Sequence, residues 1–142
     1  AIYNMEEDFA FEVAPARTFC FLSEIEMLKE QGLIKGGGLD NALVIIDKKI
    51  DEIEINRLRD LFGIEEEIAK GSNGLLNGKI LRFKNEPVRH KTLDLIGDIA
   101  LLGVPIIGHI TAARAGHASN VEFVKKLKKV YSKELEELWK DD

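Results

Sequence analysis

The feature that most constrains this fold is a helix whose two ends are both marked in the sequence. Asn85 or Glu86 can cap its start, Pro87 suits its first turn, and Gly103 with Pro105 closes it. Plotted at about 100° per residue, its apolar residues share one broad face: Val88, Leu95, Ile96, Ile99 and Leu102. The opposite side carries His90, Asp94, Gly97 and Asp98. Such a helix must pack against a core on one side and present polar groups toward a cleft on the other.

The polar strip sets His90, Asp94 and Asp98 four residues apart. Four residues correspond to about 400° of helical rotation, so the three side chains stack nearly above one another. Two such ligands one turn apart can hold a single metal ion, as two histidines do in zinc proteases. Charged residues on an outer helical face are more often simply solvated, and the spacing alone leaves both interpretations open.

A zinc site for hydrolysis needs three protein ligands and an open position for water, whose pKa the metal lowers to about 7. His90 and Asp94 supply two of these ligands. His109, on an expected strand, is better explained as a partly buried or surface histidine than as the third ligand. His117, in a glycine-flanked turn, suits proton transfer, and Asp98 could orient its imidazole.

Two further residues are candidates for the same chemistry. Lys91 and Thr18 could stabilise an oxyanion or hold a substrate, although each is as readily explained as a surface residue. The loop Lys35-Gly36-Gly37-Gly38 indicates a close backbone approach to a ligand or strand rather than a phosphate cradle, because no Gly-Lys-Ser/Thr follows it.

Composition narrows the class of protein. The 142 residues suffice for one domain with a core, and 45% of them are hydrophobic. A formal net charge of −5 argues against a general affinity for nucleic acid or anionic lipid surfaces. No apolar run approaches a membrane span, and no signal-peptide pattern opens the chain. The single cysteine, Cys20, is typical of a buried thiol in a reducing cytoplasm.

The remaining pattern predicts short elements of both kinds. Strands are expected at 9–13, 43–46, 79–83 and 106–113, and helices at 23–32, 55–62 and from 119 toward Trp139. Ser23 with Glu26, and Ser119 with Glu122, can form capping boxes. The last helix has an apolar seam of Val124, Leu127, Tyr131, Leu135 and Leu138. Irregular mixing of helices and strands favours an α+β fold, a two-layer sandwich of helices on a mixed β-sheet.

Four motifs, in order along nearly the whole chain, carry a resemblance to a known family. They are Arg17-Thr18-Phe19-Cys20-Phe21, the run from Gly32 to Gly38, the run from Asn85 to Asp98, and Ala115-Gly116-His117-Ala118-Ser119-Asn120. Together they resemble the zinc-dependent UDP-3-O-acyl-N-acetylglucosamine deacetylases of Gram-negative bacteria, which commit the pathway to lipid A.

The resemblance implies two similar domains, each a layer of helices on a mixed sheet, with the active site between them. The chain resembles the second, C-terminal domain, so 1–142 is expected to be one domain and to meet an N-terminal half supplied from elsewhere. Residues 23–50 would include a small β/α insert that forms a passage for the acyl chain. Residues 51–76 form a spacer that is longer than in compact members and similar to the type fused to a dehydratase.

The resemblance also assigns roles. His90 and Asp94 match two Zn²⁺ ligands, while the third ligand and a glutamate base belong to the absent first domain. His117 matches the histidine that protonates the amine, Asp98 its carboxylate partner, and Lys91 and Thr18 residues that line the acetamide. The substrate-binding positions are Phe19, Leu22, Ile25, Ile34, Gly37 and Val44.

The function that this implies is a cytoplasmic amidase that hydrolyses the N-acetyl group of a UDP-linked, 3-O-acylated amino sugar. The isolated chain is expected to be inactive, because it lacks a ligand and the base. One alternative is a non-catalytic module that binds an acyl chain or a partner and carries a vestigial metal site. Another, a nucleotide-binding domain built on the glycine loop, lacks a phosphate-binding lysine motif.

Overall fold

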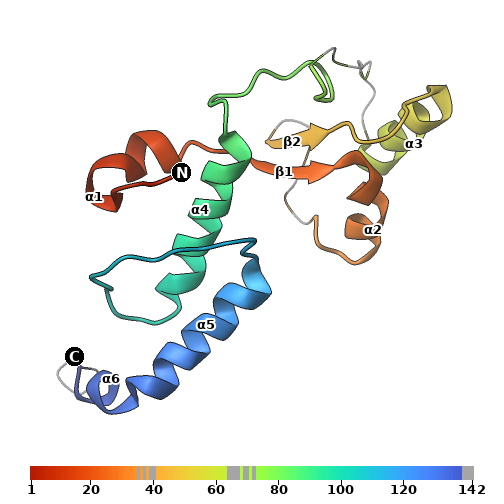
Figure 1. Ribbon diagram of the computed structural model, residues 1–142. Coiled ribbons are helices and arrows are strands. Elements are labelled where there is room, and N and C mark those ends of the chain that lie inside the picture. The colour runs from red at the N-terminus through yellow and green to blue at the C-terminus, as the bar shows by residue number, and fades with distance from the viewer. Residues whose placement is uncertain are drawn as a thin grey trace. The chain divides into compact units, whose positions relative to one another are not determined.

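The computed structural model describes residues 1–34, 36, 38, 41–63, 68, 71 and 73–138. The chain divides into two compact units. Figure 1 shows its helices and strands, coloured by residue number from the N-terminus to the C-terminus. One unit consists of Ala1–Ala14 with Val88–Asp142, and the other of Pro15–Pro87. Each unit has a hydrophobic cluster of its own.

The Pro15–Pro87 unit contains a parallel strand pair. Strand β1 (Thr18–Phe21) pairs with β2 (Ala42–Ile45), with Thr18 opposite Ala42 and Phe21 opposite Ile45. Parallel strands need a crossover connection, and here it contains a 3₁₀ turn (η2, Leu22–Glu24) and helix α2 (Ile25–Glu30). The predicted strand at 43–46 is confirmed with a shift of one residue. The strand β1 was not predicted.

The predicted helix after Ser23 is confirmed, but its capping box is wrong. The Ser23 amide and hydroxyl donate to the two carboxylate oxygens of Asp47, at 3.0 and 2.5 Å, so Ser23 does not cap the helix. The helix ends before Gly32, which adopts a left-handed backbone with φ +66°.

Helix α3 (Glu52–Phe62) confirms the helix expected over 55–62 and begins three residues earlier. Its start is set by Asp51, whose carboxylate accepts the Glu54 amide at 2.9 Å. Its end is set by Gly63, in the left-handed region at φ +62°. Both signals are local in the sequence, which is why the position of this helix could be predicted.

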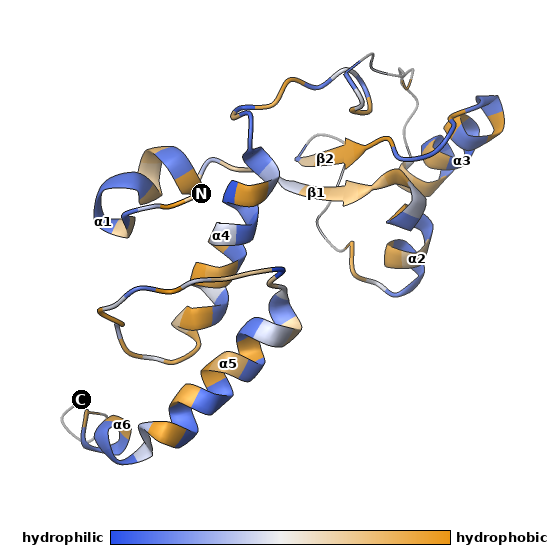
Figure 2. Cartoon of the chain, in the orientation of Figure 1, coloured by the Kyte–Doolittle hydropathy of each residue, from blue (hydrophilic) through white to orange (hydrophobic). Residues whose placement is uncertain are grey.

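The core of this unit packs the strands against α2 and α3. Its buried residues are Leu22, Ile25, Val44, Leu58, Ile68 and Leu76. Figure 2 shows both strands in the hydrophobic colours, and α3 with hydrophobic and hydrophilic residues interleaved. The helix therefore contributes one apolar side to the core and leaves the other polar.

The other unit contains helices and, among its described residues, no strand. It holds α1 (Met5–Asp8), the π-helical turn η1 (Phe9–Val13), most of α4 (Glu86–Ala100), α5 (His117–Val130) and α6 (Ser132–Leu138). Its buried cluster is Leu102, Val124 and Leu135, with Ile99, Val104 and Leu127 packed against it. The predicted helix over 86–103 is thereby confirmed. On its apolar face Leu102 is buried, whereas Val88 is 48% exposed.

The last predicted helix is interrupted. Tyr131 separates α5 from α6, and Trp139 lies outside the described residues. Of the predicted apolar seam, Val124, Leu127 and Leu135 join the core. Tyr131 and Leu138 are exposed by 52% and 57%, so their assignment to the seam is wrong.

The predicted strand at 9–13 is wrong, because this segment continues α1 as a π-helical turn. The Asn4 side chain accepts the Glu6 amide at 3.2 Å and starts the helical course. Phe11 is 80% exposed while Val13 is fully buried. Alternate residues therefore do not share one buried face, as a half-buried strand would require.

The predicted strand at 79–83 is also wrong, because its backbone groups bind side chains instead of a neighbouring strand. The Asn73 amide donates to the Lys79 carbonyl and the Arg17 guanidinium to the Ile80 carbonyl, both at 2.7 Å. The Arg82 amide donates to the Glu86 carboxylate at 2.7 Å. These bonds satisfy the polar backbone without a ladder.

The segment 106–113, predicted as a strand, forms neither helix nor strand. Neither of the two described strands, β1 and β2, pairs with it. Ile106, Ile107 and Ile110 are 40%, 102% and 42% exposed. The apolar pattern that suggested a strand is present, but the described residues offer it no partner.

The mixture of helices and strands agrees with an α+β class. The described sheet has two parallel strands, and the predicted two-layer sandwich on a larger mixed sheet is not seen in the part of the chain that the structure describes. Across these same residues, no helix has both the length and the apolar character needed to span a membrane.

Candidate active site

Helices α4 and α5 bring the chemically active side chains of their unit together. His90, Asp94 and Asp98 come from successive turns of α4, and His117 and Asn120 from the first turn of α5. Among the described residues, the carboxylates of Asp94 and Asp98 make polar contacts from α4 to His117 and Asn120 of α5.

His90 and Asp94 form the first pair of the site. His90 Nε2 lies 3.3 Å from Asp94 Oδ1, and the two side chains are only 17% and 15% exposed. Nitrogen and oxygen donors at about 2.0–2.1 Å from a tetrahedral zinc ion lie about 3.3 Å apart. The separation and the donor types of this pair therefore fit two positions of one zinc site.

Lys91 binds the other oxygen of the same carboxylate. Its Nζ lies 2.8 Å from Asp94 Oδ2, while Oδ1 faces His90. Among the described residues, no third histidine, cysteine or carboxylate completes a metal-binding group. The residues present thus fit a metal that needs at least one more ligand.

His117 and Asp98 form the second pair. His117 Nδ1 lies 2.9 and 3.1 Å from the two oxygens of Asp98. Because an ionised carboxylate only accepts, Nδ1 carries the hydrogen of this bond. Nε2, the other ring nitrogen, lies 3.9 Å from Asp94 Oδ1, so it lies on the side of the first pair.

The environment of Asp98 favours its charged form. Burial raises its pKa, but hydrogen bonds from Asn120 and His117 outweigh burial and leave the pKa below the ordinary value. Charge attraction from His117 and Lys91 acts in the same direction. An ionised Asp98 can both orient the imidazole of His117 and stabilise its protonated form.

Asn120 is a site residue that the sequence analysis missed. Its side-chain amide donates to Asp98 Oδ2 at 2.8 Å, and the residue is only 4% exposed. The predicted capping box of Ser119 with Glu122, which would place Asn120 in the first turn of a helix starting after Ser119, is wrong. Instead α5 begins at His117 behind Gly116, and the Ser119 hydroxyl accepts the Gly116 amide at 3.0 Å. The signal that could have revealed Asn120 is its position three residues after His117, on the same helical face.

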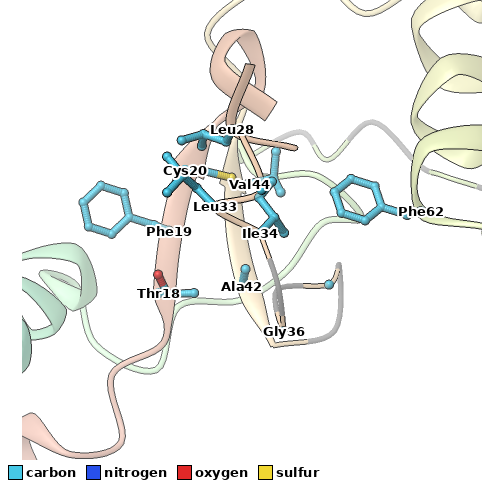
Figure 3. Close-up of a pocket in the computed structure, with 12 residues that line it drawn as sticks. Thr18, Phe19, Cys20, Leu28, Leu33, Ile34, Gly36, Ala42, Val44 and Phe62 are labelled. Carbon is cyan, nitrogen blue, oxygen red and sulfur yellow. The ribbon is translucent and has the colours of Figure 1, made fainter. Parts of the chain in front are cut away.

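The Pro15–Pro87 unit contains a mainly apolar cavity of about 440 Å³. It is bounded by both strands, by the chain after α2 and by the end of α3, and Figure 3 shows Phe62 pointing from α3 toward the strands. The residues that line it are Thr18, Phe19, Cys20, Leu28, Gly32, Leu33, Ile34, Gly36, Gly38, Ala42, Val44 and Phe62.

The cavity contains some of the expected substrate-binding residues. Phe19, Ile34 and Val44 line it. Leu22 and Ile25 are 1% and 0% exposed in the core, and they do not belong to the lining. Gly37 lies outside the described residues.

Thr18 and Cys20 lie on β1 and line the same cavity. Thr18 was expected to act with the residues of α4, and it belongs to the Pro15–Pro87 unit. Burial, with a contribution from Glu24, raises the pKa of the Cys20 thiol. A raised pKa reduces the thiolate fraction, as expected for a structural cysteine rather than a nucleophile.

Comparison with known proteins decides the family. The family model for UDP-3-O-acyl N-acetylglycosamine deacetylase matches residues 2–63 and 58–129, which together cover most of the chain. The chain belongs to the UDP-3-O-acyl-N-acetylglucosamine deacetylase family. The two matches overlap within α3 and its C-terminal end, in the segment that was expected to vary within this deacetylase family.

Curated relatives of the deacetylase family are similar over nearly the whole chain. A bifunctional enzyme LpxC/FabZ of Chlorobaculum tepidum is 54% identical over 129 residues, which are 90% of this chain and 28% of the relative. A deacetylase of Myxococcus xanthus is 43% identical over 86% of this chain and 31% of its own. A deacetylase of Chlamydia pneumoniae is 42% identical over 86% of this chain and 34% of its own length. The chain therefore spans about a third of these relatives or less.

Proposed function

We propose that this chain forms part of a zinc-dependent enzyme that hydrolyses the N-acetyl group of UDP-3-O-acyl-N-acetylglucosamine. The observation that carries the proposal is the juxtaposition of two pairs in one unit. His90 with Asp94 offers two metal ligands, and His117 with Asp98 offers a held proton donor beside them. Membership of the deacetylase family supports the same reaction.

His90 and Asp94 would hold zinc together with a ligand from outside this chain. A bound zinc ion would supply Lewis acidity that polarises the amide carbonyl and acidifies water. Lys91, already paired with Asp94, would add a positive charge where the carbonyl oxygen becomes negative. Thr18 is the other residue that the family resemblance assigns to the acetamide.

His117 would protonate the amine as the carbon–nitrogen bond breaks. An amide nitrogen leaves poorly as an anion, so it must receive a proton when acetate separates from the sugar. Asp98 holds Nδ1–H, which leaves the proton on Nε2 as the one to be transferred. After transfer, His117 is neutral and the product carries an amino group.

The cavity beside β1 and β2 would bind the acyl chain of the substrate. Its volume of about 440 Å³ lies within the usual range of small-molecule sites, and its lining is mostly hydrocarbon. Phe19, Ile34 and Val44 would contact the chain. The apolar strands and the glycines after α2 then have a functional reason for their composition.

A chimeric enzyme tests the proposal. In it, this chain replaces the 129 matching residues of the Chlorobaculum tepidum relative, and acetate release and zinc content are measured. His117→Ala should lower kcat by about 10²–10⁴-fold while zinc content is retained. His109→Ala, a matched change at a histidine outside the site, should leave kcat within about twofold. Loss of zinc from His117→Ala would make His117 a ligand and contradict its assigned role.

The metal pair and the isolated chain provide a second test. His90→Ala in the chimeric enzyme should abolish both stoichiometric zinc binding and turnover, whereas a non-catalytic module would leave turnover unchanged. The chain alone should show no deacetylation and only weak zinc binding, since two ligands make a weak site. Tight, stoichiometric zinc with turnover by the chain alone would overturn this expectation.

A further inference from the structure

We infer that Asn120 is a positioning residue for proton transfer: its amide fixes Asp98, so that Asp98 can hold His117 in one orientation. The inference deepens the proposed function and rests on it. It concerns α4 and α5 alone, which lie in the same unit.

The first step is that packing does not hold the imidazole. The His117 side chain is 68% exposed, so little of its ring is covered by neighbours. Its orientation therefore depends on the hydrogen bond from Nδ1 to Asp98, at 2.9 Å. A misoriented imidazole could still carry a proton, but its Nε2 would not point at the leaving nitrogen.

The second step is that Asp98 needs a partner besides His117. A carboxylate held by one exposed ring can rotate about its terminal torsion, which has broad preferences. Asn120 Nδ2 donates to Oδ2 at 2.8 Å, and the same oxygen receives the His117 bond. Two donors on one oxygen, one of them from a buried residue, fix the plane of the carboxylate.

The third step is that an amide suits this role chemically. The Asn120 side chain donates a hydrogen bond at any pH and carries no charge. A cation in its place would neutralise Asp98 and weaken its stabilisation of protonated His117. Asn120 thus restrains Asp98 and leaves its full negative charge to His117.

The competing explanation is that Asn120 only joins two helices. Its 4% exposure and its bond from α5 to α4 would suit a purely structural role as well. Capping of α5 does not explain Asn120, because Ser119 makes the bonds to Gly116. The two roles differ in the quantity that they change: a joint between helices contributes to the free energy of unfolding, whereas a positioning residue lowers kcat in an enzyme that stays folded and keeps its zinc.

The experiment uses the zinc-loaded chimeric enzyme. Asn120→Leu keeps the approximate shape but loses the donor, and it should lower kcat by about 10–100-fold with KM and zinc content unchanged. Asn120→Ala should have the same effect on kcat, and it replaces Asn120→Leu in the experiment if the leucine variant does not fold. Ser119→Ala, which disturbs the same helical turn without touching Asp98, should keep kcat within about twofold.

A double-mutant cycle then tests whether Asn120 acts through Asp98. In an Asp98→Ala background, Asn120→Leu should cost less than about twofold in kcat, because the group that it positions is gone. An equal cost in both backgrounds would overturn the inference. If His117→Ala and Asp98→Ala lower kcat while Asn120→Leu does not, the inference alone fails. If all three leave kcat unchanged, the proposed function fails with it.

Discussion

At the scale of single residues, Glu86 shows how a charge is kept inside the Pro15–Pro87 unit. Its side chain is fully buried, and Arg17 donates to it from the backbone, Nε and Nη2 at 2.9–3.0 Å. The Arg82 amide adds a fourth bond. Burial raises the pKa of Glu86, but these bonds outweigh burial and lower the pKa from 4.5 to about 2. The carboxylate therefore stays ionised.

Replacing this carboxylate should destabilise the protein in a pH-dependent way. Glu86→Gln should lower the free energy of unfolding by about 3 kcal/mol at pH 7, because the Arg17 side chain, only 14% exposed, loses its counter-charge. The folded pKa lies below the unfolded one, so this stabilisation is present above pH 4.5 and is lost as pH falls toward 2. Denaturant unfolding between pH 3 and pH 7 measures the difference.

Two further variants serve as comparisons for Glu86→Gln. Arg17→Lys keeps the positive charge but loses the paired donation, so part of the destabilisation should remain. Glu30→Gln, at an exposed glutamate on α2, should change the unfolding free energy by less than about 0.5 kcal/mol. A cost for Glu86→Gln that did not vary with pH would mean that shape, not charge, matters at this position.

At the scale of elements, local signals were sufficient to place α3 and α4, whereas two of the predicted strands, at 79–83 and 106–113, do not form. Asp51 and Gly63 bound α3, and both act through bonds or backbone conformations a few residues away. A strand also needs a partner, and the partner of β1 lies more than twenty residues along the chain. Sequence patterns predicted strands at 79–83 and 106–113, but no pattern indicates where a partner would lie.

The same division applies to the candidate site. The spacing of His90, Asp94 and Asp98 was sufficient to place them on one side of α4, because helical rotation is local. The bond between Asn120 and Asp98 joins two helices across 22 residues. The position of Asn120 three residues after His117 connects it with the site, but this spacing does not indicate that its partner is Asp98 on another helix.

Replacing two glycines, one inside a helix and one at a helix end, by alanine should change the unfolding free energy in opposite directions. Gly97 lies inside α4 with ordinary backbone angles, and an added Cβ would meet no atom within 4 Å. Gly97→Ala should therefore raise the unfolding free energy by about 0.5–1 kcal/mol. Gly63 ends α3 at φ +62°, so Gly63→Ala should lower it by about 1–2 kcal/mol. Thermal unfolding of the two variants checks both signs, and a loss of stability for both would contradict the first.

Narrowing the cavity between the strands and α3 should change substrate preference. Ile34→Trp should reduce kcat/KM of the chimeric enzyme for substrates with long acyl chains about tenfold more than for short ones, since a hydrophobic pocket discriminates by fit. Ile53→Trp introduces the same side chain at an exposed position of α3 outside the cavity lining. It should change kcat/KM neither for long-chain nor for short-chain substrates. Equal losses for all chain lengths would argue against an acyl site here.

At the scale of the whole molecule, the chain behaves as two units with separate cores. The helical unit contains a segment whose sequence favours a strand but which pairs with none of the described strands. The relatives are about three times longer than this chain, so they have residues that could supply a neighbouring strand.

Hydrogen exchange should register this difference between the chain and a longer protein. Backbone amides of 106–113 should exchange rapidly in the chain alone, because no described strand protects them, and at least tenfold more slowly in the chimeric enzyme. Amides of α5, bonded within their helix in both, provide the internal reference. Equal exchange in the two proteins would show that this segment gains no partner.

The exposed isoleucines at 106, 107 and 110 also affect how the chain behaves in concentrated solution. An apolar stretch whose sequence favours a strand but which has no partner among the described strands can pair with the same stretch of further copies. Solutions of the chain are thus expected to cloud as they are concentrated. A single lysine in place of the fully bare side chain, Ile107→Lys, should keep them clear.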